Sequence, residues 1–289
     1  MAAQDTLRPQ DVLDDYWVGK ELGTGARTTI HEIKRKEDGA VFALKFIPVR
    51  GEEDLHVIEH LENEYNVLTA IQEQRTTGVG IAVRAIDFQK VRKWFKVKAA
   101  YLMMERLVGR ALSDYNEYDL AEVLTIFRQV GLGLENTHSA GYVHADLKPQ
   151  NILVGEHLDV KLIDFGFAAP IGTKLTSYKG TFGYLAPEQA GGRVTGKTDV
   201  FNMAAALYWV LTGENVPSIM PGEHERMGFV PGEGVKIPPP SRLNPDVPDE
   251  LSGMVLKCLE FDPNKRPTVT QVKRYLHGLQ LRLDYTDEG

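Results

Sequence analysis

Residues 144–151, with the sequence HADLKPQN, constrain this chain more than any other segment. They bring a carboxylate (Asp146), an ammonium group (Lys148) and an amide (Asn151) close together along the chain. The carboxylate can accept a hydroxyl proton, the ammonium can offset charge on a phosphate in transit, and the amide can bind a divalent metal. The segment therefore suits the transfer of a phosphoryl group to a hydroxyl.

Apolar residues follow this loop at 152–154 and again at 160–163, and they lead into Asp164, Phe165 and Gly166. Two short strands with Asn151 at one end and Asp164 at the other would bring two metal-binding oxygens together. The pair of motifs resembles the catalytic loop and the DFG segment of protein kinases. That resemblance implies ATP as cofactor, with Mg²⁺ or Mn²⁺ held by Asn151 and Asp164. A polar loop between buried strands is the alternative interpretation.

Composition bounds the class of protein. The chain has 289 residues, 43% hydrophobic and 25% charged, which predicts a soluble globular protein with room for about two compact units. A formal charge of -7 argues against non-specific nucleic-acid binding. The single cysteine, Cys258, excludes an internal disulfide and fits a core position. No run of 18 apolar residues and no charged-then-apolar leader occurs, so we expect a cytoplasmic protein without a membrane span in this chain.

The N-terminal part reads as a polar tail over residues 1–15, followed by strand-like sequence with Gly23 and Gly25 one residue apart. This spacing predicts a tight hairpin whose bare backbone can approach phosphates. The segment resembles the glycine-rich loop of kinases, although Thr28 stands where the third glycine is usual; an ordinary hairpin is the alternative. The resemblance implies ATP contacts from Leu22, Gly23, Thr24, Gly25, Ala26, Arg27, Thr28, Thr29 and Ile30.

Lys45 lies in an otherwise apolar strand, residues 41–47, where an unpaired buried ammonium would be costly. Apolar residues at steps of three and four predict a helix over 52–73, with Glu64 on its inward face and an exposed rim position as the alternative. The strand resembles the V-A-I-K strand of kinases, which implies that Lys45 pairs with Glu64 and binds the α- and β-phosphates, and that Ala43 contacts ATP.

Residues 81–107 read as two further strands. Their turn carries aromatic residues Trp94 and Phe95 among basic ones, namely Lys90, Arg92, Lys93, Lys96 and Lys98. Such a patch can bind nucleic acid or acidic lipid, but the net negative charge favours a solvated hairpin. Residues 101–107 resemble the kinase strand and hinge that contact adenine. The implied ATP contacts are Met104, Glu105 and Leu107, together with Leu153.

Helical sequence dominates after the hinge. Asp119 and Glu122 form a capping box that begins a helix running to about residue 138. Residues 199–212 are apolar nearly all round, which predicts a helix buried on every side and ended by Gly213. Helix returns over 250–280, after a Pro/Gly-rich connection at 214–248.

Residues 164–188 read as a loop rich in hydroxyls, and Thr173, Thr176 and Ser177 are candidate phosphorylation sites. Residues 180–188 match the kinase G-T-x-x-Y-x-A-P-E segment. The match implies substrate-loop roles for Thr181 and Tyr184. It also implies structural roles for His144, Phe165, Asp199, Glu188 and Arg266, with Glu188 paired to Arg266 and Asp199 bonded to the catalytic-loop backbone.

The resemblance to eukaryotic-type serine/threonine protein kinases, especially bacterial members, extends over about residues 17–279. It implies an α+β bilobal protein-kinase fold, with a mainly β N-lobe at 16–105 carrying one regulatory helix, a mainly α C-lobe at 108–280 and a tail at 281–289. The implied activity is ATP-dependent phosphorylation of protein serine and threonine, with autophosphorylation in a possible dimer and no nucleic-acid partner. The alternatives are a nucleotide-binding pseudokinase scaffold and a small-molecule phosphotransferase.

One departure bears on regulation. Ala145 stands where the family usually has the arginine of H-R-D, which binds an activation-loop phosphate. Without that arginine the main counter-charge for a loop phosphate is missing. We therefore expect activity that depends little on activation-loop phosphorylation. Gln150 stands where kinases directed at basic targets often have glutamate, which weakens any expectation of an arginine-rich target sequence.

Overall fold

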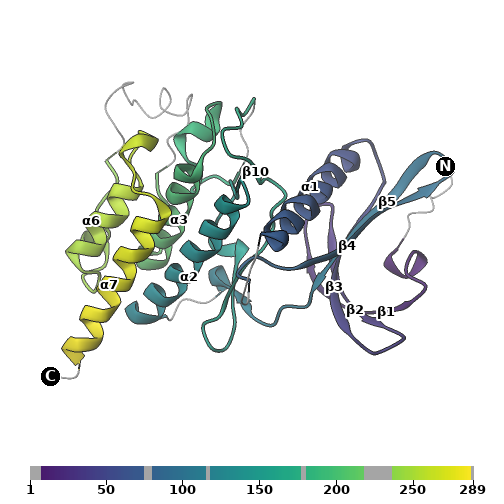
Figure 1. The fold of residues 1–289 in the computed structure, drawn as a ribbon, viewed down its shortest axis with the longest axis horizontal. Helices are drawn as coiled ribbons and strands as arrows, with labels where there is room; N and C mark the ends of the chain where they lie inside the picture. The colour runs from purple at the N-terminus through teal and green to yellow at the C-terminus, as the bar shows by residue number, and fades with distance from the viewer. Residues whose placement is uncertain (1–7, 75–79, 115–117, 177–179, 218–235, 288–289) are drawn as a thin grey trace. The chain divides into compact units, whose positions relative to one another are not determined.

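The computed structural model describes residues 8–74, 80–114, 118–176, 180–217 and 236–287. Two compact units are present (Figure 1). The N-terminal unit comprises Met1–Glu73 and Val83–Val108, and the C-terminal unit comprises Gln74–Ala82 and Gly109–Gly289. The predicted boundary between the lobes differs at residues 74–82. Of these residues, Ile81 and Ala82 join the C-terminal unit because the Leu162 N–H donates to the carbonyl of Ile81 (2.7 Å) and Ala82 pairs with Leu162.

The N-terminal unit is a five-stranded antiparallel sheet in the order β1-β2-β3-β5-β4, with one long helix. Its elements are β1 (Tyr16–Thr24), β2 (Thr29–Arg35), β3 (Val41–Pro48), α1 (Glu53–Glu73), β4 (Ala85–Lys93) and β5 (Lys96–Glu105). α1 packs through Ile58, Leu61 and Leu68, as its apolar spacing predicted. β4 and β5 form the expected hairpin around Trp94 and Phe95.

The residues just before the sheet are packed onto it. A short 3-10 helix, η1 (Pro9–Asp11), precedes Leu13, which is buried with Ile33, Leu44 and Phe46. The described part of the predicted N-terminal tail is therefore docked, because Leu13 gains an apolar environment on the sheet.

The C-terminal unit is mainly helical, with short strands that hold its loops. Its elements are β6 (Arg110–Ala111), η2 (Leu112–Asp114), α2 (Leu120–Ser139), β7 (Tyr142–Val143), η3 (Pro149–Asn151), β8 (Ile152–Val154), β9 (Val160–Leu162), β10 (Ala169–Pro170), η4 (Pro187–Ala190), α3 (Gly196–Thr212), α5 (Pro240–Leu243), α6 (Asp249–Cys258), η5 (Pro263–Lys265) and α7 (Val269–Asp287). α2 and α7 lie side by side (Figure 1) and are joined by an ion pair between Glu135 and Lys273.

α3 is the buried helix that the sequence predicted. The Thr195 side chain accepts from the Lys197 N–H at its start, and Gly213 ends it with φ 75°, a left-handed conformation that suits glycine. α7 continues past residue 280, where the tail was predicted. No glycine or proline interrupts residues 281–287, and Arg282 forms an ion pair with Glu250 of α6 (2.9 Å).

Candidate active site

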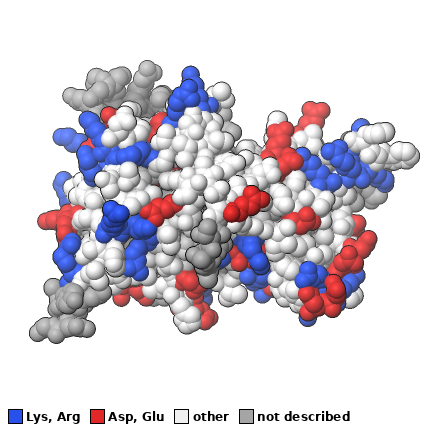
Figure 2. Space-filling model, in the orientation of Figure 1, with Lys and Arg blue, Asp and Glu red and all other residues white. Residues whose placement is uncertain are grey.

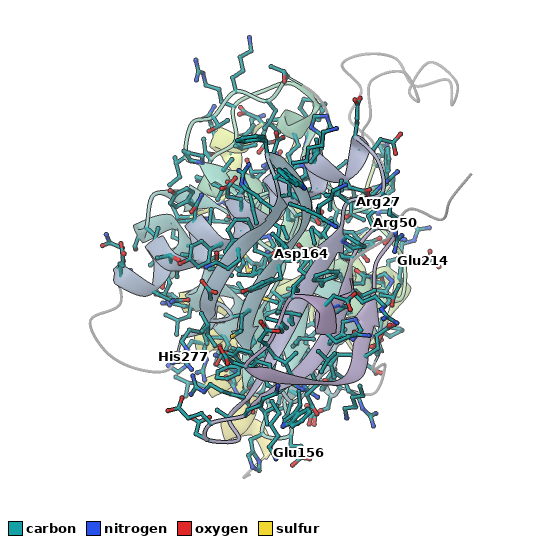
Figure 3. All side chains as sticks on the ribbon, turned by 90° about the vertical axis from the view of Figure 1, so that its right-hand side faces the viewer. Arg27, Arg50, Glu156, Asp164, Glu214 and His277 are labelled. Atoms are coloured by element: carbon teal, nitrogen blue, oxygen red, sulfur yellow. The ribbon has the colours of Figure 1, made fainter. Side chains whose placement is uncertain are left out.

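Short strands fix both ends of the 144–151 loop. β7 precedes the loop and pairs with β10, while β8 follows it and pairs with β9. The Ile163 N–H donates to the carbonyl of Asn151 (3.0 Å), so Asp164, the next residue, is held close to the end of the loop. Figure 3 labels Asp164 among the side chains. The predicted pairing of two strands, with Asn151 and Asp164 at their ends, is present.

A buried carboxylate of α3 holds the start of the same loop. Asp199 accepts the backbone N–H groups of His144 and Ala145 (both 2.9 Å), and its Oδ2 lies 2.8 Å from Nε2 of His138. Burial opposes the charged form of Asp199. The His138 contact and the bonded N–H groups outweigh that effect, so the pKa of Asp199 is below its usual value. Asp199 therefore bonds the backbone of the 144–151 loop, as the resemblance implied. His138 is a further partner of Asp199 that the sequence did not reveal.

Asp146 lies at the centre of a compact polar cluster. Its Oδ2 lies 3.2 Å from the Lys148 ammonium, and its Oδ1 accepts the Thr181 hydroxyl at 2.8 Å. Lys148 in turn donates to the Thr181 oxygen at 2.7 Å. The Asn151 amide donates to the Asp146 carbonyl (2.9 Å), with a longer contact to Oδ2 (3.4 Å). Two residues of the same loop and a threonine 35 positions away thus meet around the Asp146 carboxylate.

The oxygens of Asn151 and Asp164 suit a hard divalent cation. Since the Asn151 amide nitrogen donates to Asp146, its amide oxygen is the group left to act as a ligand. The described residues contain no group of three or more His, Cys, Asp or Glu side chains that could hold a metal. A cation with only one or two protein oxygens takes its other ligands from phosphates and water, as Mg²⁺ commonly does. The residues therefore fit a nucleotide-bound metal better than a closed structural site.

His144 and Phe165 join the loop to the DFG segment. Their rings lie 4.5 Å apart, and both side chains are fully buried. The His144 Nε2 also lies 3.2 Å from the carbonyl of Ile163. The structural positions predicted for these two residues are consistent with this packing.

In the N-terminal unit, Lys45 and Glu64 form the predicted ion pair. Nζ of Lys45 lies 2.8 Å from Oε2 of Glu64, and the Glu64 side chain is only 1% exposed. The alternative of Glu64 as an exposed rim residue is therefore wrong. Lys45 lies on the same face of β3 as Ala43, because strand side chains alternate.

The β1–β2 turn contains an ion pair that the sequence did not reveal. Arg27 donates to Asp54 (2.8 Å) at the start of α1 and also pairs with Glu53. The buried Asp54 carboxylate additionally accepts the backbone N–H groups of Arg50 (2.7 Å) and Gly51 (2.8 Å). Arg27 and Arg50 are labelled in Figure 3. The only sequence signal for this contact was an acidic residue in the first turn of a predicted helix.

Gly25 and Thr28 close the same turn. The Gly25 N–H donates to the carbonyl of Thr28 (2.8 Å), and a Cβ at residue 25 would lie 2.6 Å from the Thr28 hydroxyl oxygen. A side chain at residue 25 would therefore displace the Thr28 hydroxyl, which belongs to the residue at the position of the third glycine of the motif. Leu22, Gly23, Thr29 and Ile30 are half-buried, whereas Thr24 and Ala26 are exposed.

The end of β5 and the residues that follow it contain the positions to which the resemblance assigns adenine contacts. Met104 is buried and pairs with Ala43 across the sheet. The N–H of Glu105 donates to the carbonyl of Arg84 (2.9 Å), so any contact of a base with Glu105 would use its carbonyl group. Leu107 accepts a bond from the Arg106 side chain through its carbonyl. Leu153 belongs to β8 of the C-terminal unit and is half-buried.

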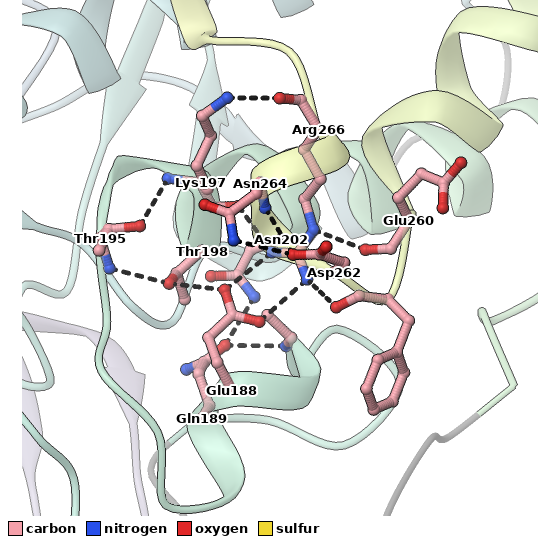
Figure 4. Close-up of polar contacts among 12 residues, drawn as sticks. Glu188, Gln189, Thr195, Lys197, Thr198, Asn202, Glu260, Asp262, Asn264 and Arg266 are labelled. Carbon is pink, nitrogen blue, oxygen red and sulfur yellow. Dashed lines mark hydrogen bonds and ion pairs between the residues drawn. The ribbon is translucent and has the colours of Figure 1, made fainter. Parts of the chain in front are cut away.

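Glu188 and Arg266 meet as the motif predicted (Figure 4). Two guanidinium nitrogens of Arg266 donate to the two carboxylate oxygens at 2.8 and 2.9 Å. Thr198 also donates to Glu188 (2.9 Å). Gln189, the next residue, donates to the carbonyl of Ala145 (2.6 Å) and so joins this assembly to the catalytic loop. No pattern in the sequence indicated that role of Gln189.

Ala145 lies in an apolar cluster instead of facing a phosphate. Val143, Ala145, Leu175 and Val194 are buried together. The adjoining loop is held by backbone bonds from Leu175 to Gly192 and from Val194 to Thr173, both 3.0 Å.

The hydroxyl residues of the loop differ in their surroundings. The Thr173 hydroxyl donates to the carbonyl of Pro170 (2.7 Å), Thr176 is exposed, and Ser177 lies outside the described residues. Tyr184 is buried, which raises the pKa of its phenol.

A profile of the protein kinase domain matches residues 16–276. This chain belongs to the protein kinase domain family. The serine/threonine-protein kinase PknB of Mycolicibacterium smegmatis is 28% identical over 277 residues, covering 89% of this chain and 41% of that protein. Mitogen-activated protein kinase kinase kinase 3 of Arabidopsis thaliana is 29% identical over 280 residues, covering 92% of this chain and 46% of that protein. This kinase domain thus spans less than half the length of these relatives.

The family and the two units confirm the predicted protein-kinase fold, with a mainly β N-terminal unit and a mainly helical C-terminal unit. Proteins of this family use ATP with a divalent metal. Within the described residues, no helix is long and apolar enough to cross a membrane.

Proposed function

We propose that this kinase domain transfers the γ-phosphoryl group of ATP to serine and threonine hydroxyls of proteins. The observation that carries the proposal is the cluster in which Asp146, Lys148 and Thr181 lie within 3.2 Å of one another. In the reaction, a bond forms between the acceptor oxygen and phosphorus while the bond to the β-phosphate oxygen breaks. Asp146 receives the hydroxyl proton, and Lys148 offsets charge on the phosphoryl oxygens.

The remaining residues act by positioning and electrostatics. In the C-terminal unit, Asn151 and Asp164 would hold Mg²⁺, or Mn²⁺ in its place. The metal would supply charge neutralisation of the phosphates when bound. In the N-terminal unit, Lys45 would bind the α- and β-phosphates, oriented by Glu64 at 2.8 Å. The glycine-rich turn, Ala43, Met104 and the segment from Glu105 to Leu107 are proposed as further ATP contacts, and Leu153 as one from the C-terminal unit.

Serine/threonine specificity rests on Lys148 and on its contact with Thr181, and it agrees with the name of the bacterial relative from Mycolicibacterium smegmatis. A pseudokinase scaffold is disfavoured because Lys45, Asp146 and Asp164 are all retained. A small-molecule phosphotransferase is disfavoured by the Glu188–Arg266 pair and by the hydrogen bond from Gln189, next to this pair, to Ala145 of the 144–151 loop. We place the activity in the cytoplasm, where a protein with one buried thiol and a need for ATP would work.

The direct test is transfer of labelled γ-phosphate from ATP to the protein itself and to a generic protein substrate, with Mg²⁺ or Mn²⁺ supplied in turn. Asp146→Asn should lower the rate on the order of 100-fold or more. Asp159→Asn is the matched control, because Asp159 is an exposed aspartate of the same unit. An Asp146→Asn variant that transfers phosphate as fast as the control would refute the proposal. Labelling that rises with the square of protein concentration would indicate autophosphorylation between two copies.

We further propose that the activation loop is held by packing, with little need for a phosphate. Ala145 offers no counter-charge, while Leu175 is buried beside it and bonded to Gly192. Alanine at Thr173, Thr176 and Ser177 together should leave the rate within a few-fold. Leu175→Asp should lower the rate by about 10-fold or more, because a charge cannot remain in that apolar cluster without cost. A 100-fold loss in the triple-alanine variant would overturn this part of the proposal.

A further inference from the structure

The end of the β4–β5 hairpin, residues 92–98, lies outside the residues proposed for catalysis and ATP binding. We call it the basic-aromatic hairpin. Its tip carries Trp94, 87% exposed, and Phe95, 94% exposed. None of residues 92–98 is buried, whereas Ala99 and Ala100 are fully buried. At about 3.4 Å per residue, the hairpin end extends on the order of 10 Å past the core of its own unit. Figure 1 shows this hairpin reaching away from the other strands of the sheet.

The backbone conformation of the turn is poorly suited to the residues that form it. Trp94 has φ 59°, a conformation in which two-residue hairpins favour glycine, asparagine or aspartate. A bulky side chain in that region is strained, and here no burial compensates for the strain. Folding alone would therefore favour another residue at this position. Strain of this kind is commonly retained where a residue serves binding.

The charges of the hairpin also indicate a role in binding. Arg92, Lys93, Lys96 and Lys98 are exposed, and among the described residues none of them forms an ion pair. Lys93 and Lys96 are paired directly across the two strands, where like charges repel. Figure 2 shows basic side chains gathered at this part of the molecule. Lys90, nearer the body of the sheet, differs because it pairs with Glu62 at 2.6 Å.

We propose that the basic-aromatic hairpin docks this kinase domain on an anionic lipid surface. Trp94 and Phe95 would enter the headgroup region, where amphipathic aromatic rings are favoured. The four cations just behind them would bind acidic headgroups. The chain carries a formal net charge of -7 overall, so these four exposed cations form a local basic surface on an acidic protein, which would orient the domain.

A lipid surface fits these features better than a nucleic acid does. Nucleic-acid sites combine stacking platforms with a basic groove that follows the backbone over several nucleotides. The basic residues of this hairpin lie on one narrow projection whose foremost side chains are apolar. An aromatic tip with cations behind it suits shallow insertion into an interface.

The test is flotation of the purified protein with two kinds of vesicle, phosphatidylcholine alone and phosphatidylcholine mixed with phosphatidylglycerol. Binding is expected only to the acidic vesicles, and it should weaken as salt is added. Lys93→Gln with Lys96→Gln should lower vesicle affinity about 25-fold, at about five-fold per cation. Phe261→Ala with Lys265→Gln is the matched control. It removes an exposed aromatic and an exposed lysine of the C-terminal unit and should bind as the unaltered protein does.

A substitution at the tip separates binding from folding. Trp94→Asn should melt at or above the temperature of the unaltered protein, because asparagine tolerates a positive φ, yet it should lose vesicle binding. Lipids brominated along their acyl chains should quench tryptophan emission in the unaltered protein but not in Trp94→Phe, which keeps an aromatic tip. Phosphorylation of a soluble protein should continue in all these variants.

Three results would overturn the proposal. The first is an absence of binding to acidic vesicles at low salt. The second is equal binding by the hairpin variants and the control. The third is capture of an oligonucleotide or an acidic protein, lost in the same variants, with no capture of vesicles.

Discussion

Removal of the Glu188 carboxylate should lower the free energy of unfolding of the C-terminal unit more than removal of an exposed carboxylate does. The Arg266 side chain is 0% exposed, and five hydrogen bonds join its guanidinium to neighbouring oxygens. Two of these go to Glu188, and the others go to the carbonyls of Glu260, Lys197 and Phe261 (Figure 4). In Glu188→Ala the carbonyl bonds remain, but the positive charge loses its only carboxylate partner among the described residues.

The expected magnitude follows from that burial. Removing one partner of a buried ion pair costs about 3–5 kcal/mol, because the other charge remains away from water. A unit of this size loses roughly 2–4 °C in Tm per kcal/mol, so the melting temperature should fall by roughly 10 °C. Loss of the bond from Thr198 to Glu188 adds to the change.

Urea unfolding and calorimetry would measure both quantities. The matched control is Glu260→Ala, which removes an exposed carboxylate 3.4 Å from Lys257 and should cost less than about 1 kcal/mol. Glu188→Gln combined with Arg266→Met should be less destabilising than Glu188→Ala, since no buried charge is then left unpaired. A Glu188→Ala protein within about 1 kcal/mol of the control would refute this account of the pair.

Three further predictions concern groups whose surroundings the structure defines. Burial raises the pKa of Cys258 to about 12, although the charges of Arg266 and Lys197 act to lower it. Iodoacetamide should therefore label this thiol at mildly alkaline pH only after unfolding, and fast labelling of the native protein would contradict its burial. Asp199 has a lowered pKa, so its charged form stabilises the fold above the unfolded pKa, and that contribution is lost as pH falls through the folded pKa. The free energy of unfolding should therefore fall less steeply with decreasing pH in Asp199→Asn than in the unaltered protein, and an equal fall in both would argue against this role of Asp199. Lys45→Met should abolish the rise in melting temperature that ATP produces in the unaltered protein, where ATP at 100 times its Kd adds about 2.7 kcal/mol to the free energy of unfolding. A retained rise would show that nucleotide binding does not need the Lys45–Glu64 pair.

Local sequence determined most of the candidate site. Asp146, Lys148 and Asn151 lie within a few residues, and their chemistry can be read without a fold. The pairing of Lys45 with Glu64 was also predictable. The resemblance to the kinase V-A-I-K strand implied a helix glutamate as the partner of Lys45, and helical periodicity placed Glu64 on the inward face of α1. The buried α3 and the β4–β5 hairpin followed from apolar pattern and turn spacing in the same way.

Contacts between distant segments were decided only by the tertiary structure. Arg27 and Asp54 meet because the β1–β2 turn reaches the first turn of α1, and nothing in either segment alone specifies the other. The burial of Ala145 with Leu175 likewise depends on how two loops of the C-terminal unit pack. Hydrophobic periodicity reports which face of an element is buried, but it does not report which remote residue covers that face. The sequence therefore determined which groups this chain has for the proposed phosphoryl transfer, and the tertiary structure decided what holds each of them in place.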